Sequence, residues 1–135
     1  MSKITRISMT FPSDLLEEFD KITAEMGYTS RSKAIQDAVR SFISEHKWLR
    51  EEEGSYAGVL MMLYDHEVKG LEHELTHIQH EYTHLISSSM HVHLTDRDCL
   101  EVIAVRGEAS EIKALQDQLS TKRGVKIVKL LITAI

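Results

Sequence analysis

Near its N-terminus the chain carries one β-strand for which the neighbouring residues supply no partner. From Arg6 to Phe11, polar and apolar residues alternate strictly, which is the pattern of a strand with one polar and one apolar face. The residues that follow, up to about position 50, carry helical spacing instead. Because a strand needs a second strand to satisfy its backbone N–H and C=O groups, the simplest arrangement is a two-fold dimer whose strands pair antiparallel.

Two amphipathic helices are predicted after this strand. Apolar residues at positions 15, 19, 22 and 26 lie on one face of a helix, which Ser13 or Asp14 can cap and Gly27 can end. A second helix starts near Ser30 and has its apolar stripe at positions 35, 38, 39 and 42, with a continuation to Trp48 and Leu49. One strand and two helices enclose too small a core for a stable monomer, which supports the dimer.

The polar face of the strand suits a DNA groove. In the dimer, a two-stranded ribbon would present this face from both chains at a width that fits the major groove. We expect Arg6 to contact a guanine and Ser8 and Thr10 to contact adjacent base edges. The N-terminal end of the second helix supplies candidate phosphate contacts: Ser30, Arg31 and Ser32. The alternative is an ordinary exposed strand face.

The charge of the chain changes at the acidic stretch from Glu51 to Ser55. Residues 1–50 hold eight Lys and Arg against seven Asp and Glu (+1), whereas residues 51–135 hold eight against fourteen (−6). The net charge of −5 therefore belongs to the second segment and does not exclude DNA binding by the first. The single cysteine excludes an intramolecular disulfide and favours the cytoplasm. No apolar run reaches the ~18 residues of a membrane span, so we expect no membrane contact.

The second segment alternates strands and helices. Strands are predicted at 58–64, 88–94, 99–105 and 125–133, with one helix over about 67–84 and another between Gly107 and Gly124. The order βαββαβ predicts a ferredoxin-like unit, in which an antiparallel sheet carries both helices on one face.

Seven of the eight histidines lie between His66 and His93. Two of them, His91 and His93, point to the same side of one strand. Cys99 begins the next strand, so the hairpin can bring it beside both imidazoles. Imidazole and thiolate together favour Zn, Cu, Ni or Co over Mg or Ca. A surface H-x-H pair and an inert buried cysteine are the alternatives.

Four histidines upstream are spaced by four, three and four residues, which places them in one stripe on a single predicted helix face. A solvated polar face explains such a stripe, and an auxiliary metal site is the alternative for the three flanking members. The stripe is His73, His77, His80 and His84.

These motifs together resemble the nickel-responsive regulators of the NikR family along almost the whole chain. No single motif is specific, but the combination is. The motifs are Arg6-x-Ser8-x-Thr10, Gly27-Tyr28-x-Ser30-Arg31-Ser32, Gln79-His80, His91-Val92-His93, Asp98-Cys99-Leu100-Glu101 and Arg123-Gly124-Val125.

The resemblance implies a nickel site shared between subunits. His91, His93 and Cys99 match the ligands from one subunit, and His80 matches the ligand from a neighbour, which implies a homotetramer built as a dimer of dimers. Three imidazoles and a thiolate in a plane suit d⁸ Ni²⁺, whereas Zn²⁺ favours a tetrahedron. The residues that match the family's surroundings of the site are Tyr64, His66 and Glu101.

The fold class implied is α+β. An N-terminal ribbon-helix-helix domain (βαα, an intertwined dimer) spans 1–50, a linker spans 51–57, and an ACT-like βαββαβ domain for metal binding and tetramerisation spans 58–135. The function implied is a nickel-dependent, sequence-specific DNA-binding regulator that represses nickel-uptake genes when Ni²⁺ is bound, with an inverted-repeat operator on double-stranded DNA.

Two alternatives remain at this stage. The ACT-like domain could sense Co, Cu or a small organic ligand. A metalloenzyme would need an open coordination position and a general base, which four protein ligands in a plane do not offer, so we expect no enzyme.

Overall fold

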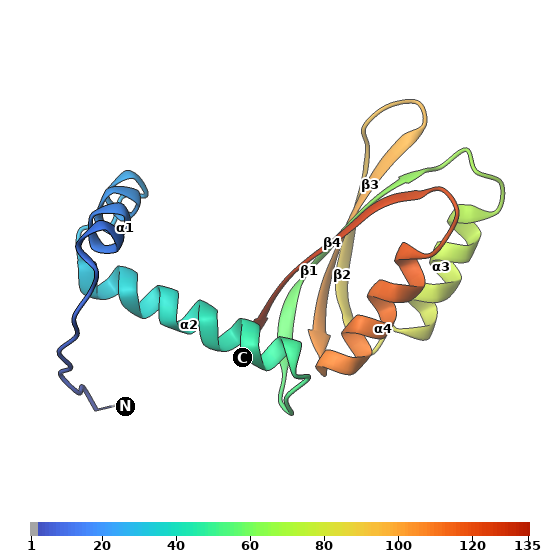
Figure 1. The fold of residues 1–135 in the computed structure, drawn as a ribbon. Helices are drawn as coiled ribbons and strands as arrows, with labels where there is room; N and C mark the ends of the chain where they lie inside the picture. Colours follow the sequence, from blue (N-terminus) through green and yellow to red (C-terminus); the bar gives the residue numbers. More distant parts are fainter. Residues whose placement is uncertain (1–2) are drawn as a thin grey trace. The chain divides into compact units, whose positions relative to one another are not determined.

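Eight helices and strands follow one another in the order α1-α2-β1-α3-β2-β3-α4-β4 (Figure 1), and the computed structural model describes residues 3–135. The chain divides into two units, one up to Ser41 and the other from Phe42 to Ile135. This boundary falls inside α2 (Arg31–Leu49), so the last two turns of that helix belong to the second unit. The domain limits at residues 50 and 58 remain a prediction.

Helices α1 (Ser13–Glu25) and α2 occur where the sequence predicts them, but the predicted cap of α1 by Ser13 or Asp14 is wrong, because the N-cap is Pro12 and no side chain caps the helix. Helix α1 follows Pro12 directly, and Gly27 reverses the chain with a φ of 92°. Before α2, the Ser30 hydroxyl accepts a hydrogen bond from the backbone N–H of Lys33 at 3.2 Å. This is the bond of an N-cap residue.

Residues 3–12 form no strand within the single described chain. The expected alternation is present, but the strand prediction differs from the structure because one chain offers no second strand. The apolar side chains of this segment remain uncovered: Ile7 is 71% and Met9 60% exposed. Helix α1 contains no buried residue, so its apolar stripe is not a core within one chain.

The second unit is a four-stranded antiparallel sheet with two helices on one face (Figure 1). Its strand order is β2-β3-β1-β4, with β1 paired to both β3 and β4. This arrangement confirms the predicted ferredoxin-like, ACT-type βαββαβ fold. The elements are β1 (Tyr56–Asp65), α3 (Leu71–Glu81), β2 (Ile86–His93), β3 (Asp98–Gly107), α4 (Ala109–Ser120) and β4 (Val125–Ala134).

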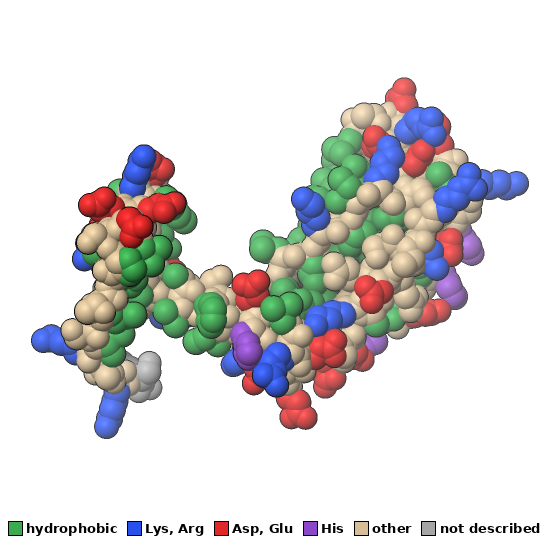
Figure 2. All heavy atoms as spheres, in the orientation of Figure 1, with side chains coloured by type: hydrophobic (Ala, Val, Ile, Leu, Met, Phe, Trp, Pro, Cys, Tyr) green, Lys and Arg blue, Asp and Glu red, His purple; other side chains and the backbone are tan. Residues whose placement is uncertain are grey.

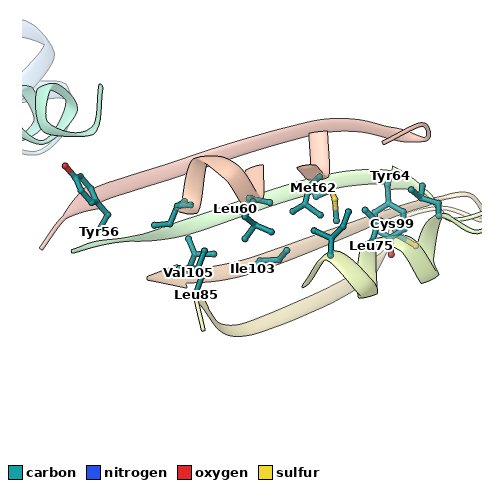
Figure 3. Packing of buried hydrophobic residues seen from close by; sticks show 14 of the residues in the cluster. Tyr56, Leu60, Met62, Tyr64, Leu75, Leu85, Cys99, Ile103 and Val105 are labelled. Atoms are coloured by element: carbon teal, nitrogen blue, oxygen red, sulfur yellow. The ribbon is translucent and has the colours of Figure 1, made fainter. Parts of the chain in front are cut away.

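Alternate residues of the central strands form the core (Figure 3). In β1 the buried side chains run from Tyr56 at one end to Tyr64 at the other, and in β3 they begin with Cys99. The core packs them against Leu75 and Ile78 of α3 and against three apolar residues of α4, Ile112, Leu115 and Leu119. Burial of each large apolar side chain contributes about 1.5–3 kcal/mol.

Helix α3 is shorter than predicted. It ends at Glu81, so the expectation that His84 continues the histidine stripe on that helix is wrong. The reason is Leu85, which is 2% exposed and whose N–H donates to the carbonyl of Tyr82 at 2.9 Å. Burial of Leu85 therefore ends the helix at a position where the histidine spacing alone predicts that it continues.

Among the described residues no helix has both the length and the apolar character needed to cross a membrane.

Gly58 provides a test of the sheet packing. A Cβ at this position would lie 2.2 Å from the backbone oxygen of Leu131, so Gly58→Ala should force β4 away from β1 and lower the free energy of unfolding by about 1–3 kcal/mol. Thermal unfolding at one protein concentration measures this.

Gly107→Ala is the matched control, because the nearest atom to its Cβ would be a side-chain methyl of Leu85 and not the backbone of a neighbouring strand. We expect a smaller loss of Tm for this variant. Equal losses in the two variants would contradict the close approach of β4 to β1.

Candidate metal centre

Two imidazoles and one thiol converge at one end of the β2–β3 hairpin. The strand register pairs His93 with Cys99, and the possible ligand atoms of His91, His93 and Cys99 all lie within 4.8 Å of one another. The Cys99 sulfur is 3.2 Å from Nδ1 of His93, and the two imidazole centroids are 5.2 Å apart. The hairpin thus brings these three residues together, as expected; their role as ligands remains a prediction.

The turn between β2 and β3 holds this register. The hydroxyl of Thr95 accepts hydrogen bonds from the N–H of Arg97 at 3.2 Å and of Asp98 at 2.9 Å. The guanidinium of Arg97 in turn donates to the buried carboxylate of Asp65 at 2.7 Å, which keeps the pKa of Asp65 below its usual range. These bonds tie the turn to the end of β1. Sequence reasoning missed the Asp65–Arg97 pair because the two residues are 32 positions apart.

The cluster combines a buried thiol with accessible imidazoles. Cys99 is 0% exposed, whereas His91 and His93 are exposed. Burial, together with the carboxylate of Glu72, raises the pKa of the Cys99 thiol. A metal ion at this thiol would have to displace its proton, while both imidazoles remain accessible to solvent.

Three residues predicted to surround the ligands lie beside them. The hydroxyl of Tyr64 is 3.1 Å from Nε2 of His91, and the pKa of Tyr64 is raised first by burial and then by the charge of Glu101. The ring of His66 faces His93 edge-on at 6.0 Å between centroids, and its Nε2 hydrogen-bonds the carbonyl of Asp96. Glu101 pairs with His91 in the register and is 8% exposed.

His80 lies on α3, outside the three-residue cluster of its own chain. It lines a hollow of about 370 Å³ that also contains His91, Tyr64 and the carboxylates of Glu72 and Glu101. A single chain does not test the prediction that His80 serves the metal site of a neighbouring subunit.

Two further histidines of the predicted stripe, His77 and His84, contact carboxylates at the surface. Nε2 of His77 is 3.1 Å from the Glu81 carboxylate, and Nε2 of His84 is 3.2 Å from that of Glu111. Within residues 3–135, the only group of three or more metal-binding side chains is His91, His93 and Cys99. The interpretation as a solvated helix face therefore explains His73 and His77 better than an auxiliary site does.

The candidate DNA contacts fall into two groups. Arg6, Ser8 and Thr10 are exposed, in the segment expected to form the ribbon. Arg31, in contrast, is held by the Asp20 carboxylate through two hydrogen bonds of 3.0 and 2.6 Å, and this pair lowers the pKa of Asp20.

The remaining candidate phosphate contacts also have partners within the chain: Ser30 caps α2, and the Ser32 hydroxyl accepts a hydrogen bond from the Gln36 amide at 3.2 Å. If Arg31 contacts a phosphate, its guanidinium has to bind the phosphate and the Asp20 carboxylate at the same time. The sequence spacing gave no signal of this pair, because Asp20 and Arg31 belong to different helices.

Figure 2 shows how the charges are distributed over one face of the molecule, with acidic and basic side chains interspersed on the second unit. Histidines appear along one rim of that unit. The net acidity of the second segment is therefore spread over its surface in this view.

Comparison with known proteins assigns a family to each of the two segments of the chain. The profile of the NikR C terminal nickel binding domain matches residues 57–133, which contain the whole cluster, and that of the ribbon-helix-helix protein, copG family, matches residues 5–45. Proteins named as nickel-responsive regulators in Methanococcus vannielii and Methanocaldococcus jannaschii are each 47% identical to this chain over 130 residues, which cover 96% of it and 92% of the relative.

A solved structure, an uncharacterized protein of Thermotoga maritima, aligns with a TM-score of 0.53 and 14% identity over 58% of this chain and 96% of its own. That likeness concerns the fold alone. The family profiles and the two relatives agree with the domain order, with a regulator rather than an enzyme, and with Ni²⁺ as the metal of the domain. The chain belongs to the family of nickel-responsive regulators, with a ribbon-helix-helix domain followed by a NikR-type nickel-binding domain.

Proposed function

We propose that the chain is a nickel-dependent, sequence-specific DNA-binding repressor of nickel-uptake genes. The convergence of His91, His93 and Cys99 within 4.8 Å carries this proposal. These residues belong to the domain that matches the nickel-binding profile, and the chain also holds the DNA-binding domain that a metal signal would control.

The donor set fits Ni²⁺. Two imidazoles and one thiolate from one chain would hold the ion, and His80 of a neighbouring subunit is our candidate for a further ligand. When bound, Ni²⁺ would supply a link between two chains. The protein's own residues prepare this geometry: the hairpin fixes the spacing of the ligands, and the Tyr64 hydroxyl orients the ring of His91.

We further propose a homotetramer, a dimer of dimers. The face of the sheet opposite α3 and α4 supports it, because it presents apolar side chains to solvent. Val59 of β1 and its register partner Leu131 of β4 are 40% and 80% exposed, and Met90 of β2 is 58% exposed. A second copy of the chain would cover this face.

In the first unit, the exposed Ile7 and Met9 support the intertwined ribbon dimer.

Two ribbon dimers in one tetramer would read two half-sites, so we expect an inverted-repeat operator. Arg6 is the proposed guanine contact, with Ser8 and Thr10 at adjacent base edges. Ser30, Arg31 and Ser32 are the proposed phosphate contacts. DNA binding and a free, buried cysteine support a cytoplasmic location.

Co²⁺ and Cu²⁺ are alternative signals for the same donor set, since Cu²⁺ is favoured on the Irving–Williams order. A small organic ligand is the other alternative, favoured by the hollow of about 370 Å³ beside His91.

The metal response is tested first by operator binding at fixed salt with Ni²⁺, Co²⁺, Cu²⁺ and Zn²⁺ in parallel. We expect Ni²⁺ to tighten operator binding most, and operator DNA to tighten Ni²⁺ binding by the same factor, because coupling between two sites is reciprocal. Operator affinity that stays the same on addition of Ni²⁺ would contradict the proposal.

The ligand assignment is tested by Cys99→Ala. Loss of the thiolate should remove the near-ultraviolet thiolate-to-metal absorption of the nickel-loaded protein and weaken Ni²⁺ binding at least about tenfold. His77→Ala is the matched control, since this histidine is exposed on α3 and pairs with Glu81. If the absorption persists without Cys99, or disappears without His77, the ligand set is wrong.

DNA recognition is tested by Arg6→Ala. Loss of a guanine contact should cost about 1–3 kcal/mol of operator binding and relax specificity at one base pair, with Ni²⁺ affinity unchanged. Lys21→Ala, an exposed change on α1, serves as the control. A uniform loss of affinity over all sequences would instead assign Arg6 to a phosphate.

A further inference from the structure

The C-terminal end of α2 is attached to the second unit by contacts that the nickel site does not use. The helix ends in a Schellman motif: the N–H of Glu52 donates to the carbonyl of Lys47 at 3.0 Å, and the N–H of Glu51 donates to that of Trp48 at 3.1 Å. Glu51 occupies the left-handed position of this motif with a φ of 52°. Glycine is the usual residue there, so the surroundings must hold Glu51 in place.

Lys113 of α4 contacts three parts of this helix end. Its ammonium donates a hydrogen bond to the Trp48 carbonyl at 2.8 Å, lies 4.8 Å from the centroid of the Trp48 ring and is 3.4 Å from the Glu51 carboxylate. A cation at the negative end of a helix is favourable, and so is a cation over an indole ring. One side chain therefore stabilises both the last turn of α2 and the reversal after it.

Two further contacts hold the same face of α2. The Trp48 ring meets Tyr56 edge-on, with centroids 5.3 Å apart. One turn earlier, the hydroxyl oxygen of Ser44 accepts a hydrogen bond from the N–H of Ala134 at 3.0 Å. Tyr56 and Ala134 are register partners in β1 and β4, so both contacts fall on one end of the sheet.

Strand β1 connects this attachment to the metal cluster. Tyr56 lies at one end of the strand, and Tyr64, whose hydroxyl contacts His91, lies at the other (Figure 3). Eight residue-to-residue steps of extended chain separate them, about 27 Å. Strand β1 is hydrogen-bonded on both sides along nearly its whole length. A displacement at its Tyr64 end would therefore be transmitted along the strand to its Tyr56 end, which contacts α2.

We infer that Lys113 is a positioning residue for the nickel response: it fixes the end of α2 on the sensor unit, so that a change at the metal cluster reaches the helix that continues into the DNA-binding unit. The sequence prediction of a domain boundary at residue 50 does not include this role, since it assigns Trp48 to the first domain. The inference depends on the proposed nickel-dependent DNA binding.

The test is Lys113→Met, which keeps an unbranched side chain and removes the charge and the hydrogen-bond donors. The measured quantity is the nickel gain, the factor by which Ni²⁺ tightens operator binding at fixed salt. We expect this gain to fall at least about fivefold, the lower end of allosteric coupling, while the Ni²⁺ affinity of the DNA-free protein changes by less than about twofold. Lys113→Arg should retain the gain, because it keeps the charge and the donors.

Lys122→Met is the matched control. Lys122 also pairs with a glutamate, at 3.3 Å, and is 30% exposed where Lys113 is 26% exposed, but its partner is Glu74 of α3. Trp48 is the only tryptophan of the chain, so acrylamide quenching of its fluorescence reports directly on the attachment. Quenching should increase in Lys113→Met and remain unchanged in Lys122→Met.

A wild-type nickel gain that Lys113→Met leaves intact would overturn the inference and leave the proposed function standing. The inference is also overturned if Ni²⁺ affinity falls as much as the gain does, because Lys113 would then support the metal site itself. A wild-type protein without any nickel gain would overturn the proposed function instead. Should Lys113→Met fail to fold, Ser44→Ala removes the second attachment and is judged by the same gain.

Discussion

The antiparallel register between β2 and β3 is the constraint on which the sensor unit depends. It pairs His93 with Cys99 and His91 with Glu101, so two imidazoles, a thiol and a carboxylate share the side of the sheet that carries the helices. A slip of one residue would turn both imidazoles to the opposite face. The turn held by Thr95 and Arg97 opposes such a slip from one end, and the buried side chains of β3 oppose it along the strand.

Strand β1 has a central position in the sheet and takes part in three features of the second unit. Its inner side chains form the core, its Tyr64 end lies beside the metal cluster, and its Tyr56 end packs against Trp48 of α2. Its outer face, which includes Val59, stays apolar and partly exposed. The same strand therefore lies beside the proposed metal site, holds the end of α2 and forms part of the surface proposed for assembly.

Most of the fold could be predicted because its signals are local. The near-continuous apolar run at residues 58–64, the helical stripe that starts at Leu15 and the turn at Gly27 are each determined by neighbouring side chains. Errors occurred where distant packing decided the outcome. Helix α3 stops at Glu81 because Leu85 turns into the core, and the strand predicted at residues 6–11 has no partner in a single chain.

The sequence by itself determined the order of the helices and strands of the second unit and the spacing of the two imidazoles and the cysteine, since periodicity and spacing are properties of adjacent residues. Only the tertiary structure decided that Cys99 is fully buried while the imidazoles stay accessible, that Arg31 is held by Asp20, and that Lys113 closes the end of α2 from 65 residues away. These contacts depend on strand order and on how helices pack on the sheet, and no local pattern of side chains encodes them.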